Sequence, residues 1–105
     1  MTVLVTGGTG YLGSAVVQAL VQKDEPVRCL IRKASPTTHL EGLKVEMAYG
    51  DICDARSIAR ALKGCDRVYH LAALYTNWLR RPGIMYRINE QGTRNVLSAC
   101  RQAAV

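Results

Sequence analysis

The chain has 105 residues, of which 49% are hydrophobic and 21% charged, so it holds at most one globular domain. No apolar run approaches the length of a membrane span, and Met1 leads into a short apolar segment instead of a signal peptide. The net charge of +6 admits nucleic acid as a partner. Lysine and arginine are scattered without a dense run, however, and we therefore expect no nucleic-acid partner. We also expect a cytoplasmic protein without a membrane span.

The four cysteines are spread through the chain without a Cys-x-x-Cys pair. They are Cys29, Cys53, Cys65 and Cys100. This spacing argues against a zinc site or a disulfide framework. We expect reduced, partly buried thiols and no metal.

Apolar residues alternate between strand-like and helix-like spacing along the whole chain. The predicted order is strand 2–6, helix 11–23, strand 26–31, loop 32–43, strand 44–48, helix 55–63, strand 66–71 and helix 84–103. Strands that alternate with helices call for a parallel sheet with right-handed crossovers. We expect the strand order 3-2-1-4, which is the N-terminal half of a doubly wound α/β fold. A ligand would then bind at the switch point between the first and fourth strands.

A glycine-rich turn joins the first predicted strand to the first predicted helix. It fits both Gly-x-Gly-x-x-Gly, through Gly8, Gly10 and Gly13, and Gly-x-x-Gly-x-x-Gly, through Gly7, Gly10 and Gly13. A strand that turns directly into a helix points the helix's unpaired N–H groups at the crevice above the sheet, where they suit a diphosphate. Glycine at 7 and 10 lets the diphosphate approach the backbone, and Gly13 allows close helix–strand packing. The alternative is a purely structural turn. The residues of this segment predicted to contact a dinucleotide are Gly7, Thr9, Gly10, Tyr11, Leu12 and Gly13.

The end of the second strand predicts which dinucleotide is bound. An NAD site of this fold places a carboxylate there for the ribose 2′-hydroxyl. The chain instead reads Leu30-Ile31-Arg32-Lys33, without a carboxylate. A guanidinium suits a 2′-phosphate through paired, charge-assisted hydrogen bonds. We predict NADP over NAD, with Arg32 as the main contact and Lys33 or Arg28 assisting; the alternative is a solvated charged loop.

Two acidic residues follow the third strand. Asp51 is placed to accept a hydrogen bond from the adenine amino group, with Ile52 packed against the ring. Its alternative is helix N-capping, which both Asp51 and Asp54 are placed to provide. We assign the cap to Asp54 and the ligand to Asp51.

Two further motifs complete the set. His70-Leu71-Ala72-Ala73 closes the fourth strand with small side chains that leave room for a cofactor, and His70 is interpreted as a satisfied core histidine. Asn89-x-x-Gly92-Thr93-x-Asn95 lies on the last helix, where Gly92 would allow close packing against the sheet and Asn89 shares its face.

Together, the glycine turn, Gly50-Asp51-x-x-Asp54 and these two motifs resemble the extended short-chain dehydrogenase/reductase family, also described as the NAD-dependent epimerase/dehydratase family. Within it the chain is most similar to the dihydroflavonol-reductase-like branch and the hopanoid-associated sugar epimerases, through 27–32 and 74–87. The resemblance favours the Gly7, Gly10, Gly13 register. It implies a Rossmann-type fold and hydride-transfer chemistry on a small-molecule substrate, as a reductase or as a nucleotide-sugar epimerase or dehydratase. It also implies that Ala72 and Ala73 line the cofactor and that Asn89 helps to shape the active site.

The family's catalytic Tyr-x-x-x-Lys pair does not occur in these residues. None of the five tyrosines is followed four positions later by lysine, and Lys63 is the last lysine. We expect residues 1–105 to be the NADP-binding Rossmann half-domain of a longer enzyme or a truncated gene product, catalytically inactive alone, with an unpaired strand edge that favours self-association. The alternative is a non-catalytic NADP sensor that binds a protein partner. The loop at 78–81 borders the substrate or is ordinary surface.

Overall fold

The computed structural model describes residues 2–72 and 87–105. The strands are β1 (Thr2–Thr6), β2 (Val27–Ile31), β3 (Glu46–Tyr49) and β4 (Cys65–His70). The α-helices are α1 (Tyr11–Gln22), α2 (Ala55–Ala61) and α4 (Gly92–Gln102), with a π-helical turn at Arg87–Gln91 leading into α4 and a 3-10 turn at Thr38–Leu40. Predicted residues 84–86 of the last helix, and the loop at 78–81, lie outside the described residues.

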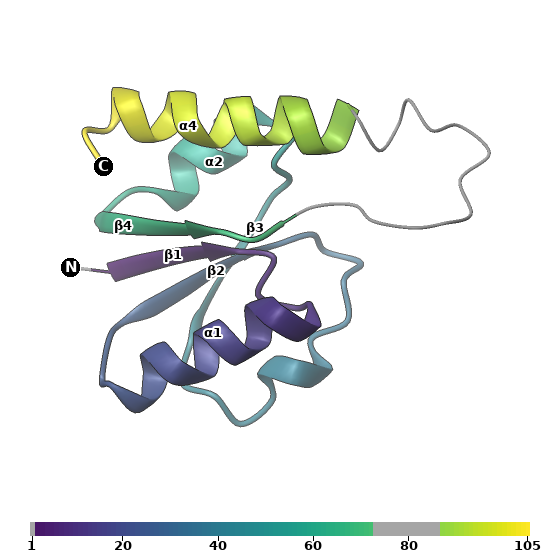
Figure 1. The fold of residues 1–105 in the computed structure, drawn as a ribbon, viewed down its shortest axis with the longest axis vertical. Helices are drawn as coiled ribbons and strands as arrows, with labels where there is room; N and C mark the ends of the chain where they lie inside the picture. The colour runs from purple at the N-terminus through teal and green to yellow at the C-terminus, as the bar shows by residue number, and fades with distance from the viewer. Residues whose placement is uncertain (1, 73–86) are drawn as a thin grey trace.

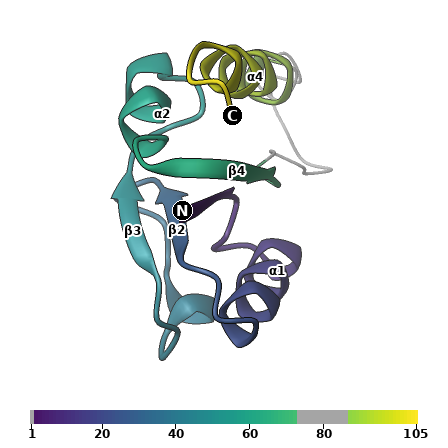
Figure 2. The ribbon, with the colours of Figure 1, turned by 90° about the vertical axis from the view of Figure 1, so that its left-hand side faces the viewer.

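The four strands form one parallel sheet in the order β3-β2-β1-β4, which confirms the predicted topology. Helix α1 covers one face of the sheet, and α2 and α4 cover the other (Figures 1 and 2). All four strands run in the same direction, so their carboxyl ends meet at one edge of the sheet. That edge is where a ligand of a doubly wound fold binds.

Strand β1 lies between two apolar clusters because successive side chains of a strand point to opposite faces. Val3 and Val5 pack with Val17 of α1, whereas Leu4 packs with Ile58 of α2 and Val96 of α4. All of these side chains are buried. Burial on both faces explains why β1 reads as an uninterrupted apolar run instead of an alternating one.

The element ends differ slightly from the predicted ones. Strand β3 runs from Glu46 to Tyr49 instead of 44–48. Helix α2 ends at Ala61 instead of 63, and Gly64 adopts a φ of +81°, a backbone conformation that suits glycine in the turn between α2 and β4. The predicted loop 32–43 contains the 3-10 turn because Leu40 is buried in the cluster under α1 and anchors the segment there.

The four cysteines are thiols, with Cys29 and Cys65 buried and Cys53 exposed. Burial raises the pKa of Cys29 to about 11. No helix in the described part of the chain is both long and apolar enough to cross a bilayer.

Candidate functional site

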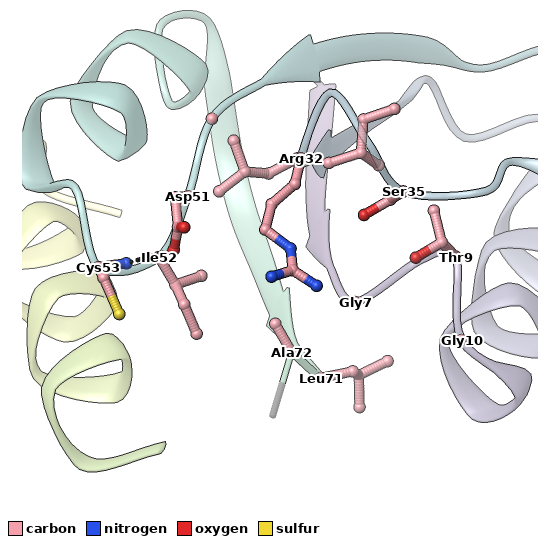
Figure 3. Close-up of a pocket in the computed structure, with 13 residues that line it drawn as sticks. Gly7, Thr9, Gly10, Arg32, Ser35, Asp51, Ile52, Cys53, Leu71 and Ala72 are labelled. Atoms are coloured by element: carbon pink, nitrogen blue, oxygen red, sulfur yellow. Dashed lines mark hydrogen bonds between the residues drawn. The ribbon is translucent and has the colours of Figure 1, made fainter. Parts of the chain in front are cut away.

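A cleft of about 370 Å³ opens at the carboxyl edge of the sheet (Figure 3). It is lined mainly by residues at or just after the ends of all four strands. Eight of them were predicted to contact a dinucleotide: Gly7, Thr9, Gly10, Arg32, Asp51, Ile52, Leu71 and Ala72. Five were not singled out from the sequence: Leu30, Ile31, Ser35, Gly50 and Cys53.

The other predicted contacts lie outside this lining. Tyr11 and Leu12 are 89% and 65% exposed, because they start α1 with their side chains in solvent while their backbone forms the helix's first turn. Lys33 is exposed, and Asn89 belongs to the π-helical turn. Gly13 is buried beneath the turn. Ala73 lies outside the described residues.

The backbone of the glycine turn selects one of its two registers. Gly7 has a φ of +78°, and a Cβ there would stand 2.6 Å from the backbone nitrogen of Ala72. A Cβ on Gly13 would overlap the carbonyl oxygen of Gly7. A Cβ on Gly8 would meet only side chains, Cys29 at 3.1 Å and Val17 at 3.3 Å. The backbone therefore demands glycine at 7 and 13 more strictly than at 8, and Gly13 serves helix–turn packing more than the predicted helix–strand packing.

Gly10 has a different role from its two partners in the motif. A Cβ there would lie 3.5 Å from the carbonyl oxygen of Gly7 and near nothing else, so the protein's own packing does not require glycine. Gly10 is the N-cap of α1, makes no side-chain cap, and is followed by a first turn without an acidic residue. The positive end of α1 thus faces the cleft uncompensated, as an anion site requires.

Arg32 follows β2 directly and extends into the cleft between Asp51 and Ser35 (Figure 3). The Ser35 amide donates a 3.0 Å hydrogen bond to the Arg32 carbonyl oxygen, a turn that brings the Ser35 side chain to the same cleft. A guanidinium and a hydroxyl are therefore both presented at the end of β2.

Arg28 was predicted to assist Arg32, and this prediction is wrong. Its Nη1 donates 2.6 Å hydrogen bonds to the carbonyl oxygens of Ala61 and Lys63, at the end of α2. Its Nε lies 3.2 Å from a carboxylate oxygen of Glu46, without hydrogen-bond geometry. Arg28 lies near the start of β2, away from its carboxyl end, so it caps a helix instead of facing the cleft.

Of Asp51 and Asp54, it is Asp54 that caps helix α2, as predicted. Asp54 is the N-cap of α2, and its carboxylate accepts a 3.1 Å hydrogen bond from the Arg56 amide. Asp51 lines the cleft, and its Oδ1 accepts a 2.9 Å hydrogen bond from the Cys53 amide. This local turn orients the carboxylate and leaves its second oxygen for another donor.

Gly92 packs differently from the prediction. A Cβ on Gly92 would overlap the Ile52 side chain, so at this end α4 lies against the loop after β3, and glycine is needed for that contact and not for contact with the sheet. Asn95, one turn later, donates a 2.9 Å hydrogen bond from Nδ2 to the Ile52 carbonyl oxygen. Through Gly92 and Asn95, the motif on the last helix therefore supports the wall of the cleft at Ile52.

His70 is hydrogen-bonded on both ring nitrogens, as predicted for a satisfied core histidine. Nδ1 lies 2.6 Å from Thr6 Oγ1, and Nε2 lies 3.1 Å from Thr93 Oγ1. Burial lowers the pKa of His70 below 6.5. Across the described ranges, no three histidine, cysteine or acidic side chains gather as a metal site would require.

A parallel sheet in this order, with a glycine turn and an uncapped helix N-terminus at its switch point, defines the cofactor half of a Rossmann-type nucleotide-binding fold. Residues 3–105 match the model of the NAD dependent epimerase/dehydratase family, and the chain belongs to that family.

Among its relatives, "Sterol demethylase protein B" of Methylococcus capsulatus is 45% identical over 105 residues, covering all of this chain and 32% of that protein. A putative dihydroflavonol 4-reductase of Synechocystis is 35% identical over 101 residues, covering 96% of this chain and 29% of the relative. The Thermus thermophilus UDP-glucose 4-epimerase, solved in complex with NAD, matches with a TM-score of 0.88 and 31% identity over all of this chain and 35% of that one. The chain thus spans about a third of the length of these proteins.

Proposed function

We propose that this chain is the dinucleotide-binding part of a reductase or nucleotide-sugar epimerase or dehydratase, and that it prefers NADP to NAD. The observation that carries the proposal is the cleft where Gly7, Gly10 and the uncapped start of α1 meet at the switch point of the sheet. Bound there, the dinucleotide's nicotinamide would accept and return a hydride.

Each part of the dinucleotide has residues suited to it. The diphosphate would lie on the turn at Gly10, where no Cβ stands in the way. The adenine would lie against Ile52, with the second Asp51 carboxylate oxygen accepting from its amino group. This arrangement uses the open backbone and the oriented carboxylate that the cleft presents.

The preference for NADP rests on Arg32. It is the charged side chain that follows β2 into the cleft, where a site for NAD would carry a carboxylate. Ser35 adds a hydroxyl beside it, and Lys33, which is exposed and follows Arg32 in the chain, would contribute its charge at longer range. The Thermus epimerase was solved with NAD, so the preference is a property we assign to this chain and not to its relatives.

The chemistry on the substrate is proposed to need residues beyond these. The 105 residues hold no Tyr-x-x-x-Lys pair, the family's proton donor and its lysine partner. We infer that the chain alone binds the dinucleotide without turnover, and that the full-length protein is a cytoplasmic enzyme acting on a small molecule. The unpaired edge of β4 would favour self-association of the isolated chain.

Calorimetric titration with NADP⁺ and with NAD⁺ tests this function. We expect NADP⁺ to bind more tightly, and Arg32→Ala to weaken NADP⁺ binding about 10- to 100-fold, the cost of one or two charge-assisted hydrogen bonds, with little effect on NAD⁺. Arg101→Ala, in the last turn of α4, is the matched control and should change neither constant. Equal affinities in the parent chain would contradict the preference, and no binding of either dinucleotide would contradict the function.

A further inference from the structure

His70 links the strand that precedes the glycine turn to the last helix. Its Nδ1 lies 2.6 Å from Thr6 Oγ1 on β1, and its Nε2 lies 3.1 Å from Thr93 Oγ1 on α4. The ring does not line the cleft. The Thr6 hydroxyl nevertheless connects the ring to Leu71 and Ala72, which do line it.

The Thr6 hydroxyl also receives two backbone donors. The amides of Leu71 and Ala72 donate to Thr6 Oγ1 at 3.1 and 3.2 Å, and the Leu71 amide shares its hydrogen with the Thr6 carbonyl oxygen at 3.0 Å. A hydroxyl oxygen has two acceptor sites and one proton. With two amides directed at this oxygen, an O–H donation to Nδ1 best explains the short 2.6 Å contact to His70. In that arrangement a neutral His70 carries its proton on Nε2 and directs it at Thr93 Oγ1.

The amides held by Thr6 belong to the floor of the cleft. Leu71 and Ala72 both line it, and their backbone approaches Gly7 so closely that a Cβ there would lie 2.6 Å away. Thr6 is fully buried, so the hydroxyl has no water to turn to if one partner changes. Any rearrangement of the Thr6 hydroxyl is thus transmitted to the backbone against which the glycine turn packs.

We propose that His70, as the neutral Nε2–H tautomer, positions the Leu71–Ala72 floor of the cleft through Thr6, and that protonation of its Nδ1 weakens dinucleotide binding. The proposal rests on the function proposed above. A proton on Nδ1 would face the Thr6 oxygen whose acceptor sites are already filled. Thr6 would then have to release one of the two amides, or the imidazolium would remain without an acceptor in a half-buried site, which costs free energy.

The surroundings of His70 favour its neutral form. Burial lowers its pKa below 6.5, and β1 carries no ionisable side chain over Thr2–Thr6. Apart from His70 itself, the neutral titratable groups on β4 and α4 are Cys65, Tyr69 and Cys100. Four charged side chains, Asp66 and Arg67 on β4 and Glu90 and Arg94 around the start of α4, are exposed and paired with other charges. Asp66 and Arg67 pair with each other, Arg67 also pairs with Glu25, and Arg94 pairs with Glu90.

The pH dependence follows from linkage. If the dinucleotide binds only to the form with neutral His70, acidification below the pKa of His70 raises Kd by up to about tenfold per pH unit. Because that pKa is lowered, the rise begins below about pH 6.5 and not above it.

The experiment measures NAD⁺ affinity of the whole chain between about pH 7.5 and 5. NAD⁺ is the probe because it lacks the 2′-phosphate, a group that itself titrates near pH 6. His70→Asn offers an oxygen near the place of Nδ1 to accept from Thr6 and does not titrate. We expect it to bind within about threefold of the parent at neutral pH, having kept one hydrogen bond, and to lose the acid dependence. His39→Asn, which replaces the exposed second histidine, should keep it. The same acid dependence in His70→Asn would overturn the proposal.

A measurement without dinucleotide separates this inference from the proposed function. In the His39→Asn chain, imidazole nitrogen NMR should report the Nε2–H tautomer, and the Ala72 amide should shift with the same midpoint as His70. Thr6→Val should abolish that coupling, whereas Thr2→Val on the same strand should not. An Nδ1–H tautomer, or an Ala72 amide indifferent to His70, would overturn the positioning role. If that coupling is present but neither dinucleotide binds at neutral pH, the positioning role stands, while the proposed function and its pH-dependent release fail.

Discussion

The side chain of Asn95 donates a 2.9 Å hydrogen bond to the carbonyl oxygen of Ile52, forty-three residues earlier in the chain. Ile52 lines the cleft, and Asn95 lies on the helix that ends the chain. The last helix thus holds in place the loop after β3, which forms one wall of the cleft. Because this contact joins distant segments, changes in α4 should be felt at the cleft.

Gly92→Ala tests the close approach of α4 to Ile52. Alanine normally stabilises a helix relative to glycine by about 1 kcal/mol. Here the new Cβ would overlap Ile52, so we expect the variant to be destabilised by about 1–3 kcal/mol, measured by urea unfolding. Ser98→Ala, at an exposed position of the same helix, should stay within about 0.5 kcal/mol of the parent. A stabilised Gly92→Ala variant would show that the two segments do not touch.

The two possible glycine registers predict opposite outcomes for neighbouring substitutions. Gly7→Ala must adopt a left-handed φ and place a Cβ against the Ala72 backbone, so we expect a loss of at least about 2 kcal/mol. Gly8→Ala meets only the side chains of Cys29 and Val17, which can shift, and should cost less. The unfolding free energies of the two variants distinguish the registers. A larger loss of stability for Gly8→Ala than for Gly7→Ala would favour the register through Gly8, Gly10 and Gly13.

Arg28→Met tests the helix-capping role of Arg28. The change removes the donor to two carbonyl oxygens at the end of α2 while keeping the aliphatic stem. We expect a loss of about 1.5–3 kcal/mol, as for hydrogen bonds from a charged group. The ratio of NADP⁺ to NAD⁺ affinity should not change. Arg60→Met, at an exposed position of α2, is the control for the lost charge. A changed cofactor ratio in Arg28→Met would restore the role that the sequence suggested.

Stability should fall on both sides of neutral pH, for two separate reasons. The lowered pKa of His70 means that the unfolded chain binds its proton first as pH falls below 6.5, so acid favours unfolding. The Cys29 pKa of about 11, raised from 9.0, means that the unfolded thiol ionises first between those values, so alkali also favours unfolding.

Urea midpoints across pH measure both losses. The acid loss should shrink in His70→Asn, and the alkaline loss should shrink in Cys29→Ala. Unchanged profiles in both variants would contradict the assignments. His39→Asn should leave both the acid loss and the alkaline loss of stability as they are in the parent chain.

Cys53 and Cys29 should differ in reactivity toward a thiol reagent. Cys53 is exposed and lines the cleft, whereas Cys29 is buried with a raised pKa that keeps it protonated. We expect Cys53 to be modified first. The absorbance of the released reagent, recorded for the Cys29→Ala and Cys53→Ala variants, assigns each rate to one thiol. Saturating NADP⁺ should slow the modification of Cys53 alone. Equal protection of both thiols would point to global stabilisation by the dinucleotide instead of contact with the cleft wall.

The strands and the local turns were predictable from the sequence because each depends on near neighbours. The strand order was predictable because strands that alternate with helices join through right-handed crossovers. The apolar run of β1, the Asp54 cap and the positive φ of Gly64 follow from strand burial, side-chain capping and turn geometry within a few residues. The position of Arg32 after β2 was equally local, since a strand end fixes which residue comes next.

The partners of Arg28, Gly92 and His70 were decided by the tertiary structure alone. Each lies on a regular element, and each meets a residue that sequence spacing cannot bring to it: the end of α2, Ile52 and Thr6. Which residues meet across layers depends on strand register and on the angle at which helices cross the sheet. The sequence by itself therefore determined the parallel sheet, its switch point and the kind of ligand expected there. The side chains that shape and support the cleft were settled only when the layers packed, because packing direction is a property of the whole sheet.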